Sequence, residues 1–121
     1  MKVLVIDDNE ETLEVVSFFF NVNGIDCITE KSGKKGLEIL QKNDFDLVLL
    51  DLAIPDMSGI QIFDTIKDEG VVSKKNIIIF TASFIDQKEV QRMLNSGAKG
   101  IINKPLALND LEKLIELHLS V

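Results

Sequence analysis

Short apolar runs alternate with amphipathic segments along the whole chain. The runs that predict strands are residues 2–6, 26–29, 46–50, 76–80 and 100–102. Three of them are continuously apolar and rich in Val, Ile and Leu, which is typical of strands that are covered on both faces. The alternation predicts an α/β protein with a (βα)5 chain, in which a doubly wound, mostly parallel sheet carries helices on both faces.

Five segments beside these runs predict amphipathic helices. Their apolar faces are formed by Leu13, Val16 and Phe20, by Leu37 and Leu40, by Ile62, Phe63 and Ile66, by Val90, Met93 and Leu94, and by Leu111, Leu114 and Ile115. Helix starts are expected at pairs with capping-box spacing, namely Asp8 with Glu11, Ser58 with Gln61, and Asn109 with Glu112. Helix ends are expected at Gly24, Gly70 and Gly97.

The first predicted helix has a second apolar stripe away from its core face. Val15, Phe18 and Val22 recur at helical spacing, with Glu11 and Glu14 at the edge of the stripe. The last helix would cover part of this stripe, Val22 in particular. Phe18 is expected to be exposed, and an exposed large apolar side chain indicates a docking surface.

Composition narrows the class of protein. The 121 residues have a length typical of one domain, and we expect residues 1–121 to form a single domain. Twenty acidic residues against 13 basic ones give a formal net charge of −7. Such an acidic chain is poorly suited to phosphate backbones, so direct nucleic-acid binding is not expected.

The cysteine content and the hydropathy of the sequence exclude further classes of protein. Cys27 is the only cysteine, so an intramolecular disulfide is impossible, and a small apolar side chain on a strand is its simplest role. The N-terminal residues become acidic too soon for a signal peptide, and no apolar stretch approaches the roughly 20 residues that span a bilayer. We expect a cytoplasmic protein that does not associate with membranes.

Polar residues follow four of the five predicted strands. Asp7 and Asp8 follow the first strand, Asp51 ends the third, Thr81 ends the fourth, and Lys104 follows the fifth. Open α/β sheets bind ligands at the carboxyl ends of their strands, so these side chains are expected to meet at one edge. Each alone has an ordinary explanation, such as a helix start for the aspartate pair. No packing rule, however, requires a charged or hydroxyl residue at each of these ends.

Together these residues indicate phosphoryl transfer. Three carboxylates favour a hard divalent cation, and Mg²⁺ suits a site with few protein ligands and several waters. The cation and Lys104 would neutralise phosphoryl oxygens, and the Thr81 hydroxyl could donate to another oxygen. Asp51 would then be the nucleophile that accepts the phosphoryl group.

The ordered set of motifs closely resembles the receiver domain of two-component response regulators. The matching residues are the pair Asp7–Asp8, DLAIPDMSG from Asp51 onward, TA at 81–82, GA at 97–98 and KP at 104–105. The resemblance covers the whole chain and implies the flavodoxin-like strand order 2-1-3-4-5, ringed by five helices. It also implies a phosphorylation-controlled switch, not a conventional enzyme, which catalyses only its own phosphorylation and dephosphorylation.

The resemblance also implies a set of metal ligands. Asp8 and Asp51 correspond to the residues whose side chains bind Mg²⁺ directly. The carbonyl of Ala53 corresponds to a third ligand, and Asp7 to a residue that acts mostly through water.

Further roles and partners follow from the same resemblance. Thr81 corresponds to the switch hydroxyl and Lys104 to the lysine that pairs with the phosphate. The phosphoryl donor would be a histidine kinase or phosphotransfer protein, which docks beside the first helix. The output would be altered binding to a downstream protein target, by a monomer or weak dimer.

The sequence departs from the family pattern at three places. Ile101 stands where many receivers carry an aromatic residue that moves with the switch hydroxyl. Ala53 offers no side chain over the phosphate. The stretch from Thr81 to Lys104 is slightly longer than usual, and the extra length is expected in the loop that holds Phe84.

Three other classes of protein are alternatives to a phosphorylated receiver domain. A phosphate-independent pseudo-receiver, which acts only as an interaction module, is the main one, although such modules usually lose site residues and none of the five is lost. A haloacid-dehalogenase-type phosphatase requires a second aspartate two residues after the first, where Ala53 stands. A dinucleotide-binding fold needs a glycine-rich turn after the first strand, and residues 7–11 contain no glycine.

Overall fold

The structure is a computed structural model that describes residues 1–82 and 86–119. Its elements are, in order, β1 (Lys2–Ile6), α1 (Glu10–Val22), β2 (Asp26–Glu30), α2 (Gly33–Lys42), β3 (Leu47–Asp51), α3 (Gly59–Asp68), α4 (Val72–Lys75), β4 (Ile77–Thr81), α5 (Gln87–Asn95), β5 (Gly100–Asn103), α6 (Leu108–Leu114) and the π-helical segment η1 (Ile115–Leu119). The predicted alternation is confirmed, and each strand lies within one residue of its predicted bounds. The expectation for the loop at Phe84 lies outside the described residues.

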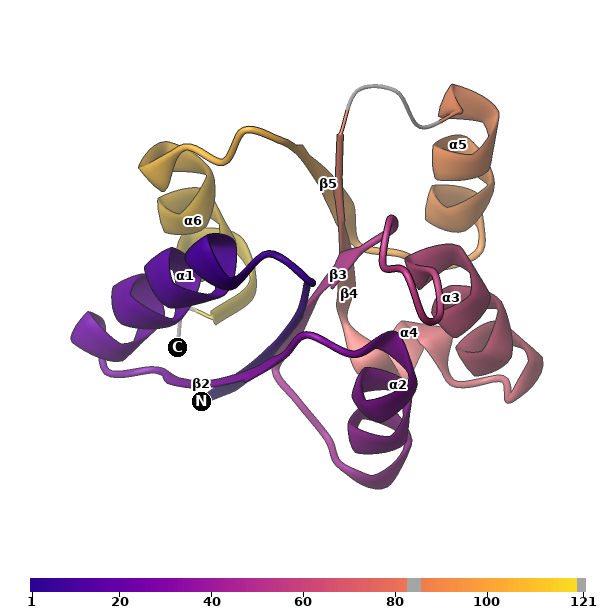
Figure 1. Cartoon of the computed structure of the whole chain (residues 1–121), viewed down its shortest axis with the longest axis horizontal. Coiled ribbons are helices and arrows are strands. Elements are labelled where there is room, and N and C mark those ends of the chain that lie inside the picture. The colour runs from indigo at the N-terminus through magenta and orange to yellow at the C-terminus, as the bar shows by residue number, and fades with distance from the viewer. Residues whose placement is uncertain (83–85, 120–121) are drawn as a thin grey trace.

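The five strands form one parallel sheet in the order β2-β1-β3-β4-β5, as predicted. Figure 1 shows α1 and α6 on one face of the sheet and α2, α3 and α5 on the other. The strand order reverses between β1 and β3, because β2 lies outside β1. Open α/β sheets bind ligands outside the carboxyl ends of the strands at such a switch point. The topology therefore places the ends of β1 and β3 at the centre of a potential site.

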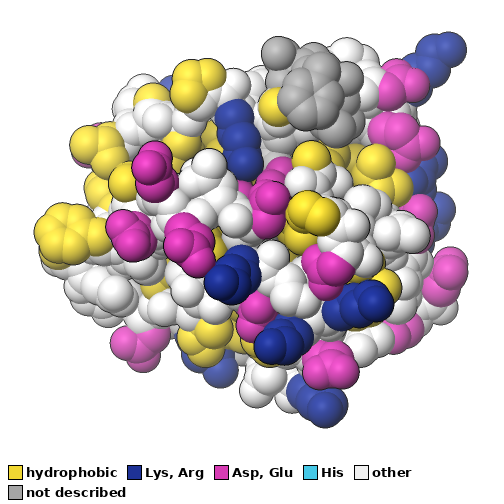
Figure 2. Space-filling view, viewed as in Figure 1, with side chains coloured by type: hydrophobic (Ala, Val, Ile, Leu, Met, Phe, Trp, Pro, Cys, Tyr) yellow, Lys and Arg dark blue, Asp and Glu magenta, His cyan; other side chains and the backbone are white. Residues whose placement is uncertain are grey.

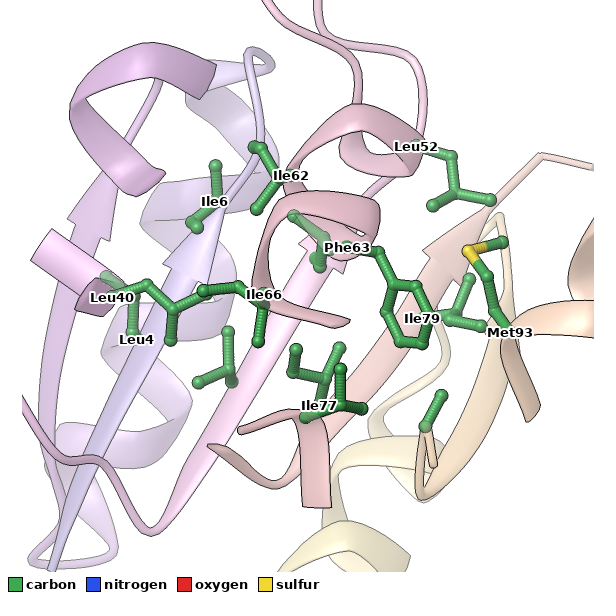
Figure 3. Close-up of a cluster of buried hydrophobic side chains, with 14 of the residues drawn as sticks. Leu4, Ile6, Leu40, Leu52, Ile62, Phe63, Ile66, Ile77, Ile79 and Met93 are labelled. Carbon is green, nitrogen blue, oxygen red and sulfur yellow. The ribbon is translucent and has the colours of Figure 1, made fainter. Parts of the chain in front are cut away.

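Two hydrophobic cores lie on the two faces of the sheet. Leu4 and Ile6 of β1 belong to the core under α2, α3 and α5 (Figure 3), whereas Val3 and Val5 belong to the core under α1 and α6. Successive side chains of a strand point to opposite faces, so a strand covered on both sides must be apolar at every position. This explains the continuous apolar runs in the sequence. Cys27 of β2 packs against the second core, as its predicted structural role requires.

The start of α1 differs from the prediction. The N-cap is Asn9, whose side-chain oxygen accepts a hydrogen bond from Thr12 N at 3.0 Å. Asp7 Oδ1 accepts from Asn9 N at 2.9 Å, and this bond orders the turn between β1 and α1. The predicted cap at Asp8 is therefore wrong, and Asp8 lies in the turn ahead of the helix.

Of the other two predicted helix starts, one is confirmed and one is wrong. Ser58 and Gln61 form a complete capping box at α3, as predicted. The predicted start at Asn109 is wrong, because α6 begins at Leu108. There the carboxylate of Asp110 reaches back to accept a hydrogen bond from Ala107 N at 3.1 Å.

Glycines end the helices where they were expected, and one short helix was not expected. Gly24, Gly70 and Gly97 all have positive φ, the left-handed conformation that glycine adopts without steric penalty. The four-residue helix α4 lies between α3 and β4 and ends at Asn76, which also has positive φ. The expectation of five helices is therefore wrong by this additional turn. No helix within residues 1–82 and 86–119 is long and apolar enough to cross a membrane.

Candidate functional site

Three carboxylates converge at the carboxyl edge of the sheet. Asp7 follows β1, and Asp51 ends β3, the neighbouring strand. One carboxylate oxygen from each of Asp7, Asp8 and Asp51 lies within 4.8 Å of the others. Asp7 and Asp51 are buried, whereas Asp8 is exposed. The predicted convergence of these three residues is thus present, in a cluster that is open to solvent on the Asp8 side.

Lys104 joins this cluster from the loop after β5. Its Nζ lies 2.9 Å from Asp7 Oδ2 and 3.4 Å from Asp51 Oδ2. The same ammonium lies 4.9 Å from the centroid of the Phe80 ring, and the backbone N of Lys104 donates to Thr81 O at 2.7 Å. The peptide bond from Lys104 to Pro105 is cis. One ammonium therefore serves two buried carboxylates, and the site keeps an excess of negative charge.

Burial and neighbouring charges shift the pKa of Asp51 and the pKa of Lys104. Burial raises the pKa of Asp51 to about 6, and the negative charge on Asp7 adds to this rise. The Ala53 amide and Lys104 lower the pKa of Asp51 without cancelling the effect of burial. Burial alone would lower the pKa of Lys104, but its contacts with Asp7 and Asp51 outweigh burial and raise that pKa. Burial and, to a smaller extent, the charge on Asp7 thus oppose the ionisation of Asp51, and a further positive charge would favour it.

An unsatisfied oxygen tests whether the cluster fits a metal ion. Asp7 Oδ2 is buried and, within residues 1–82 and 86–119, has no hydrogen-bond partner beside its ion-pair contact with the Lys104 ammonium at 2.9 Å. Buried polar atoms normally find a partner, and an orphan such as this one is expected beside an ion or water. The donor set consists of carboxylate oxygens, which hard divalent cations prefer. The residues present therefore fit a divalent cation.

Thr81 lies at the end of β4, buried beside this cluster. Its hydroxyl donates to the carbonyl of Ala82 at 3.2 Å, a local bond at the long end of the range. Asp51 pairs in register with Phe80, so Thr81 extends one residue beyond the level of Asp51. The hydroxyl is therefore near the carboxyl edge of the sheet, where the acidic cluster lies, and is held by one weak bond.

The loop between β3 and α3 contains a residue whose contacts were not expected from the sequence. Asp56 accepts three hydrogen bonds from the first turn of α2, from Ser32 Oγ at 2.8 Å, Gly33 N at 2.9 Å and Lys34 N at 3.2 Å. These bonds, with that of Gly33 N the strongest cause, hold the pKa of Asp56 well below its usual range. Because the partners are 22 to 24 residues away in sequence, no local pattern could have identified them.

An apolar patch lies on α1 and the start of α6. It consists of Val15, Phe18, Val22 and Leu108, which we call the α1 patch, and their exposed fractions are 51%, 71%, 63% and 59%. They line a groove of about 460 Å³. Figure 2 shows hydrophobic side chains protruding over α1, with acidic side chains gathered near the start of that helix. Phe18 is exposed as predicted, whereas the expectation that the last helix covers Val22 is wrong.

The comparisons with known proteins agree on one family. The model of the response regulator receiver domain matches residues 3–116. The polar-differentiation response regulator DivK of Brucella ovis is 25% identical over 117 residues, which are 97% of this chain and 94% of that protein. The transcriptional regulatory protein CrdR of Helicobacter pylori is 29% identical over 115 residues, which are 95% of this chain and 53% of that protein. The chain thus spans about half the length of CrdR.

Solved structures agree with this result. A response regulator receiver domain protein from Clostridium thermocellum has a TM-score of 0.82 and 30% identity, and the match covers 95% of this chain and 90% of that one. The chemotaxis protein CheY4 of Vibrio cholerae, at 24% identity, shares the fold with a TM-score of 0.82 and 97% coverage of both chains. From the family match over residues 3–116, the fold and the convergent acidic cluster, we conclude that this chain belongs to the response regulator receiver domain family.

Proposed function

We propose that this protein is a phosphorylation-controlled switch that accepts a phosphoryl group on Asp51 and signals through altered protein–protein binding. The observation that carries the proposal is the position of Lys104, whose Nζ contacts both Asp7 Oδ2 and Asp51 Oδ2. Here one ammonium contacts two buried carboxylates, and a carboxylate oxygen of the exposed Asp8 lies within 4.8 Å of theirs. Such an arrangement is suited to the additional oxygens of a phosphoryl group and to a second cation.

The transfer is a substitution at phosphorus. A carboxylate oxygen of Asp51 forms the new P–O bond as the bond between phosphorus and the donor breaks, and the donor atom keeps the electron pair. With a phosphohistidine donor the leaving group is the imidazole nitrogen, and the product is an acyl phosphate on Asp51. This reaction needs ionised Asp51, so groups that oppose the raised pKa of Asp51 promote the step.

The residues of the site have separate tasks in this step. Lys104 would move from the two carboxylates to a phosphoryl oxygen, with which its ammonium forms a charge-assisted contact. Thr81 would exchange its long bond to Ala82 for a phosphoryl oxygen. Mg²⁺, held by Asp8, Asp51 and the Ala53 carbonyl with Asp7 acting mostly through water, would supply the positive charge that neutralises carboxylates and phosphoryl oxygens.

We assign the phosphoryl donor to a histidine kinase or phosphotransfer protein that docks on the α1 patch. Val15, Phe18 and Val22 expose apolar surface along α1, which is the helix that follows the Asp7–Asp8 turn. Exposed apolar surface of this kind is a recognition site for a partner with a complementary apolar face. The net charge of −7 argues against direct nucleic-acid binding, and we place the switch in the cytoplasm as a monomer or weak dimer.

Phosphorylation by a small donor tests the proposal directly. We expect incubation with acetyl phosphate and Mg²⁺ to add one hydroxylamine-labile phosphate, measured by intact mass. The label should disappear in Asp51→Asn and in wild-type protein treated with EDTA. If the wild type stays unmodified while a control receiver is labelled, the protein is a phosphate-independent pseudo-receiver and the proposal is wrong.

A further inference from the structure

We propose that Asp56 is a positioning residue for the phosphorylation site, because it clamps the β3–α3 loop to α2 and thereby orients the Ala53 carbonyl toward the metal. The inference rests on the proposed function, since it assumes that Mg²⁺ binds at Asp8, Asp51 and Ala53. It adds that the affinity for Mg²⁺ depends on a contact to a helix that supplies none of the proposed ligands.

The clamp consists of one carboxylate and three donors. Asp56 Oδ1 accepts from Gly33 N at 2.9 Å, and Oδ2 accepts from Ser32 Oγ at 2.8 Å and Lys34 N at 3.2 Å. Two of these donors are backbone amides of the first turn of α2, which have no partner within the helix. Both carboxylate oxygens accept hydrogen bonds, so the contact fixes the orientation of the Asp56 carboxylate relative to α2 as well as its distance from that helix.

Close packing brings the loop within reach of α2. A Cβ atom added at Gly33 would lie 2.2 Å from the carbonyl oxygen of Met57, so only glycine allows this approach. At Gly59, where the loop enters α3, an added Cβ would meet the carbonyl oxygen of Asp51, so the end of the loop also packs closely on its start. The C-terminal part of the loop therefore packs both against α2 and against the backbone of the proposed phosphoryl acceptor.

Ala53 is an exposed residue between two buried ones near the start of this loop. Leu52 and Ile54 on either side are buried, but Ala53 itself is exposed and its methyl group holds nothing in place. Its amide donates to Asp51 Oδ1 at 3.2 Å, a long bond that orients the peptide only weakly. The direction of the Ala53 carbonyl therefore depends on how firmly the rest of the loop is held, and Asp56 supplies the polar part of that hold.

The contact between Asp56 and α2 should make hydrogen exchange in α2 sensitive to Mg²⁺ binding. If Mg²⁺ binding fixes the Ala53 carbonyl, it also restricts the loop, and linkage requires that the clamp and the ion stabilise each other. The amides of Gly33 and Lys34 donate to Asp56 and lie in a helix with no proposed ligand. Their hydrogen exchange should slow when Mg²⁺ binds to the wild type.

The test measures Mg²⁺ affinity in variants of Asp56. The chain has no Trp or Tyr, so the titration is followed by amide chemical shifts or calorimetry. We expect Asp56→Ala to weaken Mg²⁺ binding about tenfold, at the low end of the range found when residues that orient metal ligands are lost. Asp56→Glu keeps the charge but misplaces the carboxylate, and it should weaken binding as much as Asp56→Ala. Asp56→Asn keeps the shape, can still accept from Gly33 N, and should recover most of the affinity.

A matched control separates positioning from loss of negative charge. Asp46 is an exposed aspartate that also accepts a hydrogen bond from a backbone amide, from Lys2 N at 2.8 Å, at the opposite edge of the sheet. Asp46→Ala should leave the Mg²⁺ affinity unchanged. In Asp56→Ala, Mg²⁺ should no longer slow exchange at Gly33 and Lys34.

The outcomes distinguish this inference from the proposed function. If the wild type binds no Mg²⁺, the proposed function fails and the inference fails with it. If the wild type binds Mg²⁺ and Asp56→Ala and Asp56→Glu bind it equally well, the inference alone is wrong. A loss in Asp46→Ala as large as in Asp56→Ala would likewise overturn it, because the effect would then reflect net charge.

Discussion

Replacing Asp51 by asparagine should make the metal-free protein more stable near neutral pH. The Asp51 side chain is only 5% exposed and lies in a cluster with two other carboxylates. Asparagine has nearly the same shape and removes the charge, and its amide oxygen can still accept from Ala53 N as Asp51 Oδ1 does at 3.2 Å. The variant thus relieves the desolvation and repulsion of Asp51 without opening a cavity.

The magnitude follows from the pKa of Asp51 in the folded and unfolded chain. Burial raises this pKa from 3.8 to about 6. Because the folded-state pKa is the higher one, Asp51 contributes stability that is fully present below pH 3.8 and is lost as the pH rises through 6. A difference of one unit between the folded and unfolded pKa corresponds to about 1.4 kcal/mol of stability. The stability advantage of Asp51→Asn over the wild type should therefore grow by about 2 kcal/mol between pH 4 and pH 7.5.

Urea unfolding followed by far-UV circular dichroism measures this advantage. Both proteins are unfolded in EDTA over the same pH series, and the difference between their free energies of unfolding is plotted against pH. Excess Mg²⁺ at pH 7.5 provides the control, since a cation that binds the native carboxylates stabilises the wild type more than the variant and narrows the difference.

Two results would refute this reasoning. A difference that stays constant from pH 4 to pH 7.5 would show that the folded and unfolded chains hold Asp51 with the same pKa. A wild type that is more stable than Asp51→Asn at pH 7.5 in EDTA, by an amount that grows with pH, would show that Lys104 dominates over burial and the charge on Asp7. In either case the site would not need a further cation to ionise Asp51.

The remaining predictions concern ligands, switching and docking. Asp8→Ala should weaken Mg²⁺ binding more than Asp7→Ala, because Asp8 is the proposed direct ligand, and equal losses in a Mg²⁺ titration would contradict this assignment. Thr81→Ala should still accept phosphate, but the amide shift changes that beryllofluoride causes in residues 86–104 should shrink; changes equal to those of the wild type would refute a switching role. Phe18→Ala should slow phosphotransfer from the cognate kinase by about 1–3 kcal/mol of lost docking energy and leave acetyl phosphate labelling intact. An equal loss with both donors would show that Phe18 acts through the fold.

Periodicity was sufficient to predict the fold because the three central strands, β1, β3 and β4, are buried on both faces. In β3 and β4 every side chain is buried, so the positions before Asp51 and before Thr81 are continuously apolar. The site followed from the same argument, since parallel strands end at one edge and polar residues stand at those ends. Asp7, Asp51 and Lys104 are brought together by strand order alone, and the motifs identify that order through the family.

Contacts that depend on distant pairing could not be predicted in this way. The capping residue of α1 is Asn9, whose amide donates to Asp7, whereas the capping-box spacing had favoured Asp8. Asp56 reaches donors on α2 that lie beside it only after the sheet has formed. The groove of the α1 patch needed Leu108, which belongs to α6 and joins α1 only through tertiary packing.

A short segment connects the carboxyl edge of the sheet, where the proposed phosphoryl acceptor lies, with the α1 patch. Lys104 N is bonded to Thr81 O at 2.7 Å, and four residues later the chain enters α6 at Leu108, which lines the groove beside Phe18. Ile101 pairs with Ile79 in the sheet and has no aromatic ring to rotate as Thr81 moves. We expect a displacement of Thr81 or Lys104 toward a phosphoryl group to shift residues 104–108, because Lys104 begins this segment and its backbone is bonded to Thr81. The path leads to the groove proposed to receive the donor, so phosphorylation is expected to reshape the surface from which the donor must dissociate.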